Sequence, residues 1–133
     1  MIHEIRIALI DDHEMVLQGL GALLDSQTGL KVIAKFKSGE DAAEQLEMDK
    51  VDVILTDINM PGLNGFETLS ALIIKNPNSK IIMLSMETGS NYMRKAKEEG
   101  AKGFVSKTAP IEDLKEAILL VFQGNEYFTM GVD

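Results

Sequence analysis

Three aspartates in this chain have the positions and spacing of a metal site. Asp11 and Asp12 come directly after the apolar run 6–10, and Asp57 follows a second apolar run at 51–56. Both runs are typical of buried parallel strands, whose carboxyl ends meet at one edge of a sheet. Three carboxylates at one edge are unfavourable unless a cation lies among them. Because Mg²⁺ prefers carboxylate oxygens, the three aspartates predict a divalent-metal site.

Asp11 and Asp12 also have an ordinary structural interpretation, because acids often end strands and cap the first turn of the next helix. Asp57 is different, because the tight loop 58–62 that comes after it gives no reason for a helix cap. A carboxylate held beside a cation can attack phosphorus and form an aspartyl phosphate. Asp57 is therefore the candidate nucleophile.

Ser85 and Lys107 close two further apolar runs at the same expected edge. Lys107 could bind a phosphoryl oxygen as a compact charge, and Ser85 could donate a hydrogen bond to another oxygen. Taken singly, Lys107 is an ordinary surface lysine and Ser85 is a strand-end hydroxyl that the backbone satisfies. Their joint placement with Asp57 favours phosphoryl transfer by positioning and electrostatics.

The elements that would position these residues alternate along the chain. Strand-like apolar runs occupy residues 5–10, 30–36, 51–56, 81–85 and 103–105. Apolar residues at helical spacing lie between them, and the first helix is marked by Val16, Leu20, Leu23 and Leu24. Gly100 and Gly124 stand where helices should stop. The order is (βα)5, and continuous apolar strands favour a parallel sheet covered by helices on both faces.

Composition limits the class of protein. A chain of 133 residues with 45% hydrophobic residues fits one globular domain. It has no cysteine, no signal-peptide pattern and no apolar run near the roughly 18 residues that cross a membrane, so we expect a cytoplasmic protein without membrane contact. The formal charge of −8 argues against nucleic-acid binding by these residues. That charge reflects either solubility alone or a metal pocket.

Four sequence blocks, in order and covering nearly the whole chain, carry a resemblance to a known family. They occupy residues 9–13 (Leu-Ile-Asp-Asp-His), 55–65, 82–85 and 101–107. With these blocks the chain resembles the receiver domain of two-component response regulators, and Asp-Asp-His and Gly-Phe-Val-Ser-Lys resemble the NarL/FixJ-type subgroup. The resemblance implies an α/β fold with a doubly wound, five-stranded parallel sheet in the flavodoxin-like order 2-1-3-4-5.

The resemblance also implies roles for the residues at the sheet edge. Asp57 would be the phosphoacceptor and would receive a phosphoryl group from the phosphohistidine of a sensor histidine kinase. Asp12 and Asp57 would ligate Mg²⁺ by side chain, Asp11 mainly through water, and Asn59 by its backbone carbonyl. Lys107 would pair with the phosphoryl group.

Two further residues would form the switch implied by the resemblance. Ser85 would move toward the phosphoryl group, and Phe104 would follow by changing rotamer, although an aromatic residue in a fifth strand is otherwise ordinary core. Ser85 stands where the family often has threonine. Many receivers have proline with a cis bond directly after the lysine; here Thr108 follows Lys107, which leaves the isomer of that bond open.

The first and last helices have more apolar residues than one inward face needs. Met15 and Leu17 extend the set on the first helix, and Leu119 and Leu120 extend that of the last. These residues are either scattered surface apolars or a contact face for a kinase, an attached domain or a second copy, as in a homodimer formed on phosphorylation.

The domain expectation is a receiver at residues 1–126, followed at 127–133 by a tail or the start of a linker. The leading hypothesis is a phosphorylation switch that controls transcription through a C-terminal helix-turn-helix domain absent from this chain, the only part that would contact DNA. A stand-alone receiver that acts by protein–protein contact, as in phosphorelays or chemotaxis, is the first alternative. A Mg²⁺-dependent phosphohydrolase is disfavoured, because Asn59 stands where such enzymes need a second acid. We expect no enzyme activity beyond the chain's own phosphorylation and slow dephosphorylation.

Overall fold

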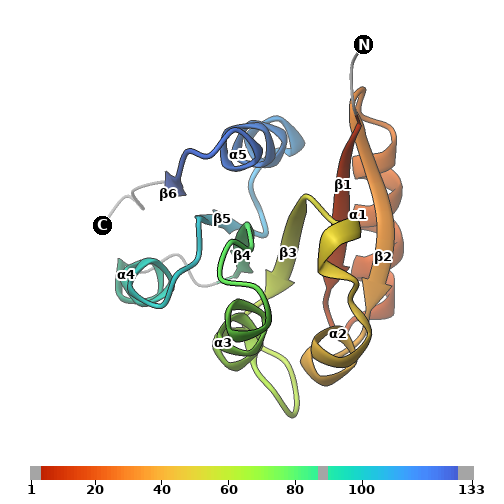
Figure 1. Cartoon of the computed structure of the whole chain (residues 1–133). Coiled ribbons are helices and arrows are strands. Elements are labelled where there is room, and N and C mark those ends of the chain that lie inside the picture. The colour runs from red at the N-terminus through yellow and green to blue at the C-terminus, as the bar shows by residue number, and fades with distance from the viewer. Residues whose placement is uncertain (1–3, 87–89, 129–133) are drawn as a thin grey trace.

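Six parallel strands form a single sheet with helices on both faces in the computed structural model, which describes residues 4–86 and 90–128 (Figure 1). The strands are β1 (Ile5–Ile10), β2 (Leu30–Phe36), β3 (Val53–Asp57), β4 (Ile81–Ser85), β5 (Gly103–Ser106) and β6 (Tyr127–Phe128). The helices are α1 (Glu14–Asp25), α2 (Gly39–Gln45), α3 (Gly65–Lys75), α4 (Ser90–Glu98) and α5 (Ile111–Phe122), with the short 3-10 helix η1 at Met48–Lys50.

The strand order is β2-β1-β3-β4-β5-β6, so the α/β doubly wound class and the expected order of the first five strands are confirmed. The sheet differs from the expectation of five strands by the addition of β6. Tyr127 and Phe128, the expected start of a tail or linker, pair with β5 instead. Two residues are too few to show any strand periodicity, which is why the sequence contains no signal for β6. The rest of that segment, 129–133, lies outside the described residues.

Each face of the sheet is covered by its own set of helices. α1 and α5 pack over one face, and α2, α3 and α4 contribute to the cluster on the other. The buried stripe of α1 consists of Leu17, Gly21 and Leu24, whereas Leu23 is 45% exposed. The predicted inner face of α1 is thus rotated, because Gly21 gives no apolar signal and adjacent leucines cannot both face the sheet. No helix in the described ranges is long and apolar enough to span a bilayer.

Local sequence explains where the elements around the sheet edge begin and end. Asn64 opens α3 with a capping box, since its side chain accepts from the Glu67 N–H and the Glu67 carboxylate accepts from the Asn64 N–H. Gly100 ends the turn after α4 with a φ of 103°, a conformation that favours glycine. β3 begins two residues later than predicted, where the Asp52 carboxylate accepts from the Arg6 backbone N–H before the strand starts, and it ends one residue later than predicted, at Asp57.

The register of the sheet aligns the carboxyl ends of four strands. Ile10 is opposite Thr56, Asp57 is opposite Leu84, and Ser85 is opposite Ser106. The residues directly after β1 and β5 therefore reach the same edge as Asp57 and Ser85. This edge is where open parallel sheets bind ligands.

Candidate functional site at the carboxyl edge of the sheet

Lys107 lies between two of the three predicted aspartates. Its Nζ is 2.9 Å from Oδ2 of Asp11 and 3.0 Å from Oδ1 of Asp57. The Lys107 side chain is 14% exposed and both carboxylates are 5% exposed, so the pairs are largely shielded from water. The backbone N–H of Lys107 donates to the carbonyl of Ser85 at 2.9 Å, which fixes the start of this side chain beside β4.

Asp12 completes the acidic cluster together with a histidine that the sequence did not single out as a site residue. Asp11, Asp12, His13 and Asp57 each offer one possible ligand atom, and these atoms lie within 4.8 Å of one another. His13 Nδ1 is 3.1 Å from Oδ1 of Asp11, to which the His13 backbone N–H also donates at 2.9 Å. The position of His13 directly after Asp-Asp was the available signal, but its ring is mostly exposed and sequence alone does not fix its direction.

The electrostatics of the cluster are unbalanced. Burial, and then the nearby charge of Asp11, raise the pKa of the Asp57 carboxyl above its usual range, although hydrogen bonds from Lys107 and from the Asn59 backbone N–H act against this. Burial acts to lower the pKa of Lys107, but hydrogen bonds to Asp11 and Asp57 outweigh it and raise that pKa. Asp11 and Asp57 share one lysine, and Asp12 lies beside them without a contact to it, so the cluster holds more acid than base.

The donor set fits a hard divalent cation. Carboxylate oxygens are the ligands that Mg²⁺ prefers, and the Oδ1 atom of Asp12 is buried without a hydrogen-bond partner among the described residues. His13 Nδ1 approaches that oxygen to 3.2 Å, but not in a hydrogen-bonding geometry. An unpartnered buried carboxylate oxygen is costly, and a bound cation would satisfy it.

The remaining predicted residues lie around this cluster. Asn59 is exposed and its backbone N–H points at the Asp57 carboxylate. Ser85 is fully buried one position beyond the partner of Asp57 on β4, and Phe104 is buried in the cluster that α3 and α4 form over the sheet. None of the described peptide bonds is cis, so the Lys107–Thr108 bond is trans.

The order and spacing of these residues match a known family. The profile of the response regulator receiver domain matches residues 7–119, which include every residue of the cluster. The chain belongs to the response regulator receiver family. This family is not a classical enzyme family, and the receiver fold is the one that the sheet order displays.

Individual relatives place this receiver more closely. It is 34% identical over 128 residues to the response regulator UvrY of Escherichia coli K12, covering 96% of this chain and 59% of the relative. It is 36% identical over 125 residues to the transcriptional regulatory protein DegU of Brevibacillus brevis, covering 94% of this chain and 53% of the relative. This chain therefore spans a little more than half the length of these curated relatives.

Solved structures agree with that placement. A two-component response regulator of the LuxR family from Aurantimonas sp. SI85-9A1 superposes with a TM-score of 0.88 at 28% identity, covering 93% of this receiver and 89% of that chain. Together with UvrY and DegU, this similarity confirms the NarL/FixJ-type resemblance.

Proposed function

We propose that this receiver accepts a phosphoryl group on Asp57 and relays it as a conformational change. The observation that carries the proposal is the position of Asp57: a buried carboxylate with Lys107 Nζ 3.0 Å away, inside a cluster that holds more acid than base. A buried carboxylate whose pKa is raised although a lysine lies beside it is a candidate for a reactive group rather than for a structural ion pair.

The chemistry is an in-line displacement at phosphorus. An oxygen of the Asp57 carboxylate forms the new P–O bond, the P–N bond of a kinase phosphohistidine breaks, and its electron pair stays on the imidazole nitrogen. The Lys107 ammonium group, which contacts Asp11 and Asp57 before the reaction, pairs with one phosphoryl oxygen afterwards. The Ser85 hydroxyl donates a hydrogen bond to a second phosphoryl oxygen. The N–H of Asn59, directed at Asp57, orients the carboxylate.

The acidic cluster is the proposed magnesium site. Asp12, Asp57 and the Asn59 carbonyl would ligate Mg²⁺, with Asp11 acting mainly through water. When bound, this ion supplies positive charge that offsets the charges of the nucleophile and the phosphoryl group. Asp11 is already held by Lys107 through Oδ2 and by His13 through Oδ1, so it orients the lysine, and its contact with the ion would run through water.

The test is phosphorylation by a small donor, followed by intact-mass spectrometry. Incubation of the chain with Mg²⁺ and acetyl phosphate should add one phosphoryl group, and Asp57→Asn should abolish the addition. Asp52→Asn is the matched control, because Asp52 precedes the same strand and pairs with Arg6 at its other end. Undiminished labelling of Asp57→Asn would refute the assignment of the acceptor.

The wider role is proposed from the relatives. A sensor histidine kinase is the proposed donor, and transcription control through a separate helix-turn-helix domain is the proposed output, since DegU is named a transcriptional regulatory protein. Residues 1–126 with β6 would form the receiver, and the chain beyond β6 would lead toward the output domain. A cytoplasmic location is part of this proposal and rests on the family.

A homodimer formed on phosphorylation is proposed from one surface. Met15 of α1 is 87% exposed, and Leu23 of α1 and Leu119 of α5 are also exposed. Exposed apolar residues on these two neighbouring helices fit a contact with a second copy. Analytical ultracentrifugation with and without beryllofluoride, on the parent and Met15→Glu, tests this surface.

A further inference from the structure

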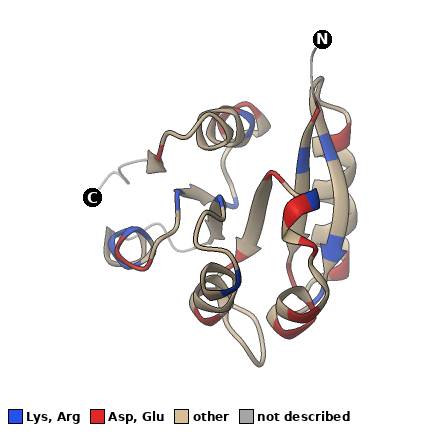
Figure 2. Cartoon of the chain, viewed as in Figure 1, with Lys and Arg blue, Asp and Glu red and all other residues tan. Residues whose placement is uncertain are grey.

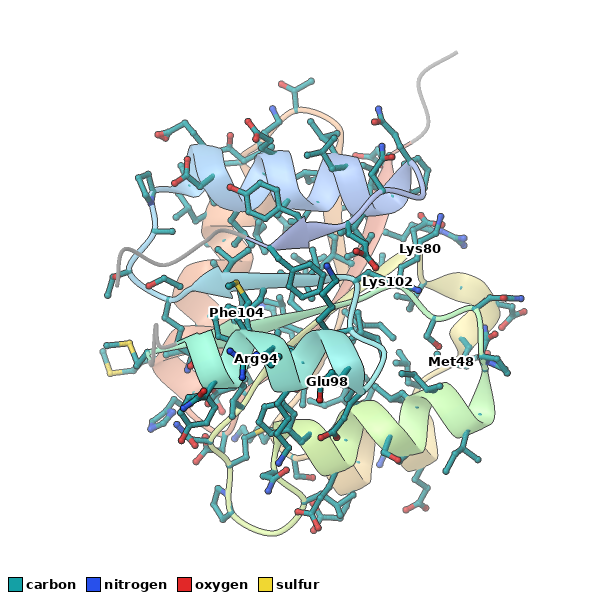
Figure 3. The ribbon with its side chains drawn as sticks, turned by 90° about the vertical axis from the view of Figure 1, so that its left-hand side faces the viewer. Met48, Lys80, Arg94, Glu98, Lys102 and Phe104 are labelled. Carbon is teal, nitrogen blue, oxygen red and sulfur yellow. The ribbon has the colours of Figure 1, made fainter. Side chains whose placement is uncertain are left out.

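The short strand β6 joins the sheet directly beside the predicted switch residue. Tyr127 is opposite Gly103 and Phe128 is opposite Phe104, and the Tyr127 N–H donates to the Lys102 carbonyl at 3.0 Å. Figure 3 shows β6 beside β5, with α5 on one side and α4 on the other. β6, the last element of the described residues, is thereby attached to the strand that carries Phe104.

The two side chains of β6 face opposite layers of the domain. Tyr127 packs against the cluster under α1 and α5, whereas Phe128 packs against the cluster that contains Phe104. Residues paired on neighbouring strands have side chains on the same face, about 5 Å apart. The Phe128 side chain is therefore on the same face of the sheet as that of Phe104, and it packs against the cluster that contains Phe104 at the edge where β6 is the last strand of the described sheet.

The surroundings are shaped to receive β6. A Cβ on Gly103 would lie 3.2 Å from the Tyr127 carbonyl oxygen and 3.1 Å from Cγ1 of Ile82, so this close approach of strands favours glycine. From α4, Lys97 Nζ lies 5.5 Å from the centre of the Phe128 ring and 3.8 Å from a carboxylate oxygen of Glu126. Each exposed contact is weak alone, but together they tie β6 to both β5 and α4.

We propose that Phe128 is a positioning residue for the switch: docked in β6, it holds Phe104 in the buried rotamer. This inference rests on the proposed function, in which phosphorylation of Asp57 favours one rotamer of Phe104. A Phe104 ring turned out of the core toward the edge of β5 would enter the space that the Phe128 ring occupies. Docking of β6 and burial of Phe104 therefore support each other.

The coupling between these two events is reciprocal. If β6 docking favours the buried Phe104 that accompanies phosphorylation, phosphorylation must favour β6 docking by the same factor. The phosphoryl group would thus tighten the first residues of the segment that leads out of the receiver. If a domain is attached after β6, docking of β6 would change the length and direction of the linker to it.

The experiment measures the affinity of the 133-residue chain for beryllofluoride, a phosphoryl mimic, in the presence of Mg²⁺ by NMR titration. Phe128→Ala should weaken binding about fivefold, at the low end of common allosteric couplings. Phe122→Ala is the matched control: Phe122 is also half-buried with a lysine, Lys80, 5.4 Å from its ring centre, but it packs against the other cluster. It should leave the affinity within about twofold.

Three further readouts separate positioning from general stability. Phe128→Leu, which restores an apolar side chain, should recover most of the affinity. Without any phosphate, Phe128→Ala should remove NOEs between the Phe104 ring and the core. In the parent, beryllofluoride should slow hydrogen exchange of the Tyr127 amide.

The outcomes are distinguishable from those of the proposed function. Equal affinities for Phe128→Ala and the parent, with unchanged Tyr127 exchange, overturn the positioning role even though Asp57 is phosphorylated. A parent that takes up neither beryllofluoride nor a phosphoryl group overturns the proposed function, and the positioning role with it. Equal weakening in Phe122→Ala would show that only stability had been lost and would also overturn the proposal.

Discussion

Strand β3 has an aspartate at each end, and the two aspartates differ in the balance of charge around them. Asp52 precedes the strand and Asp57 ends it, and Figure 2 shows acidic residues at both ends of β3. Asp52 has Arg6 to itself: its carboxylate accepts from the Arg6 backbone N–H at 2.8 Å, from Nε at 3.1 Å and from Nη2 at 3.2 Å. Asp57 shares one lysine with Asp11, and Asp12 lies alongside.

The pKa values of the two carboxyls move in opposite directions as a result. Burial acts to raise the pKa of Asp52, but the hydrogen bonds from Arg6 outweigh it and lower that pKa. Burial also acts on Asp57, and here the nearby Asp11 adds to it, so the pKa is raised despite Lys107. A carboxylate with its own cation is a structural pair. A carboxylate that shares its cation with another acid keeps uncompensated negative charge, which a bound metal ion would offset.

We call the Asp57 end of β3 the crowded end and the Asp52 end the balanced end. The largest effect is expected when the crowded end loses the lysine that Asp11 and Asp57 share. Lys107→Met leaves Asp11 and Asp57 buried without their partner, and we expect the free energy of unfolding without metal to fall by about 3 kcal/mol. Urea denaturation with and without Mg²⁺ measures the loss, and Mg²⁺ should restore part of it. Arg6→Met is the control and should cost less, because the Arg6 side chain is 43% exposed and water can replace it. Equal losses at the two ends would contradict the comparison.

The crowded end is predictable from sequence because chain order and strand periodicity decide it. Apolar runs place Asp11, Asp12, Ser85 and Lys107 at strand ends, and a parallel sheet brings such ends to one edge whatever the side-chain details. The balanced end is not predictable in this way, since the apolar pattern includes Asp52 within a strand run. Nothing in the sequence says that Arg6, 46 positions earlier, reaches it.

Side-chain direction and very short elements set the other limits. The sequence does not single out His13 as a site residue, yet its ring reaches Asp11, because rotamer choice depends on neighbours that sequence does not place. The inner face of α1 is rotated from the prediction because Gly21 contributes contact without an apolar side chain. The strand β6 is defined by its pairing with Gly103 and Phe104 and not by any pattern of its own.

The second test asks whether only the crowded end binds metal. Asp12→Asn removes the buried carboxylate oxygen that lacks a hydrogen-bond partner among the described residues, so the Mg²⁺ dissociation constant should rise at least about tenfold. Isothermal titration calorimetry measures it. Asp52→Asn should leave the constant unchanged, since that carboxylate is already occupied by Arg6. An unchanged constant in Asp12→Asn would place the metal elsewhere.

A third test predicts effects of opposite sign from the same substitution at the two ends of β3. Without metal, Asp57→Asn should raise the free energy of unfolding, because it removes a buried charge repelled by Asp11. Asp52→Asn should lower it, because Arg6 loses a charged partner. Saturating Mg²⁺ should reverse the sign for Asp57→Asn and leave Asp52→Asn unchanged. Destabilisation by both substitutions without metal would show that Lys107 alone balances the acidic cluster.

The smallest effect is a difference in pH dependence between the two ends. Because its pKa is raised in the folded state, Asp57 binds a proton more readily in the folded than in the unfolded protein. Its negative charge therefore destabilises the metal-free protein at pH values above 3.8, the ordinary pKa of an aspartate. The stability advantage of Asp57→Asn should therefore be full at neutral pH and shrink as pH falls through the raised pKa toward 3.8. Asp52 has the opposite sign: its lowered pKa gives stability that is present above 3.8 and lost as pH falls through the folded value. The urea unfolding midpoints of the parent and both variants, measured from neutral pH down to the lowest pH at which the protein folds, would show the two trends. If the midpoints of the two variants changed in parallel with pH, the two ends of β3 would not differ in charge balance.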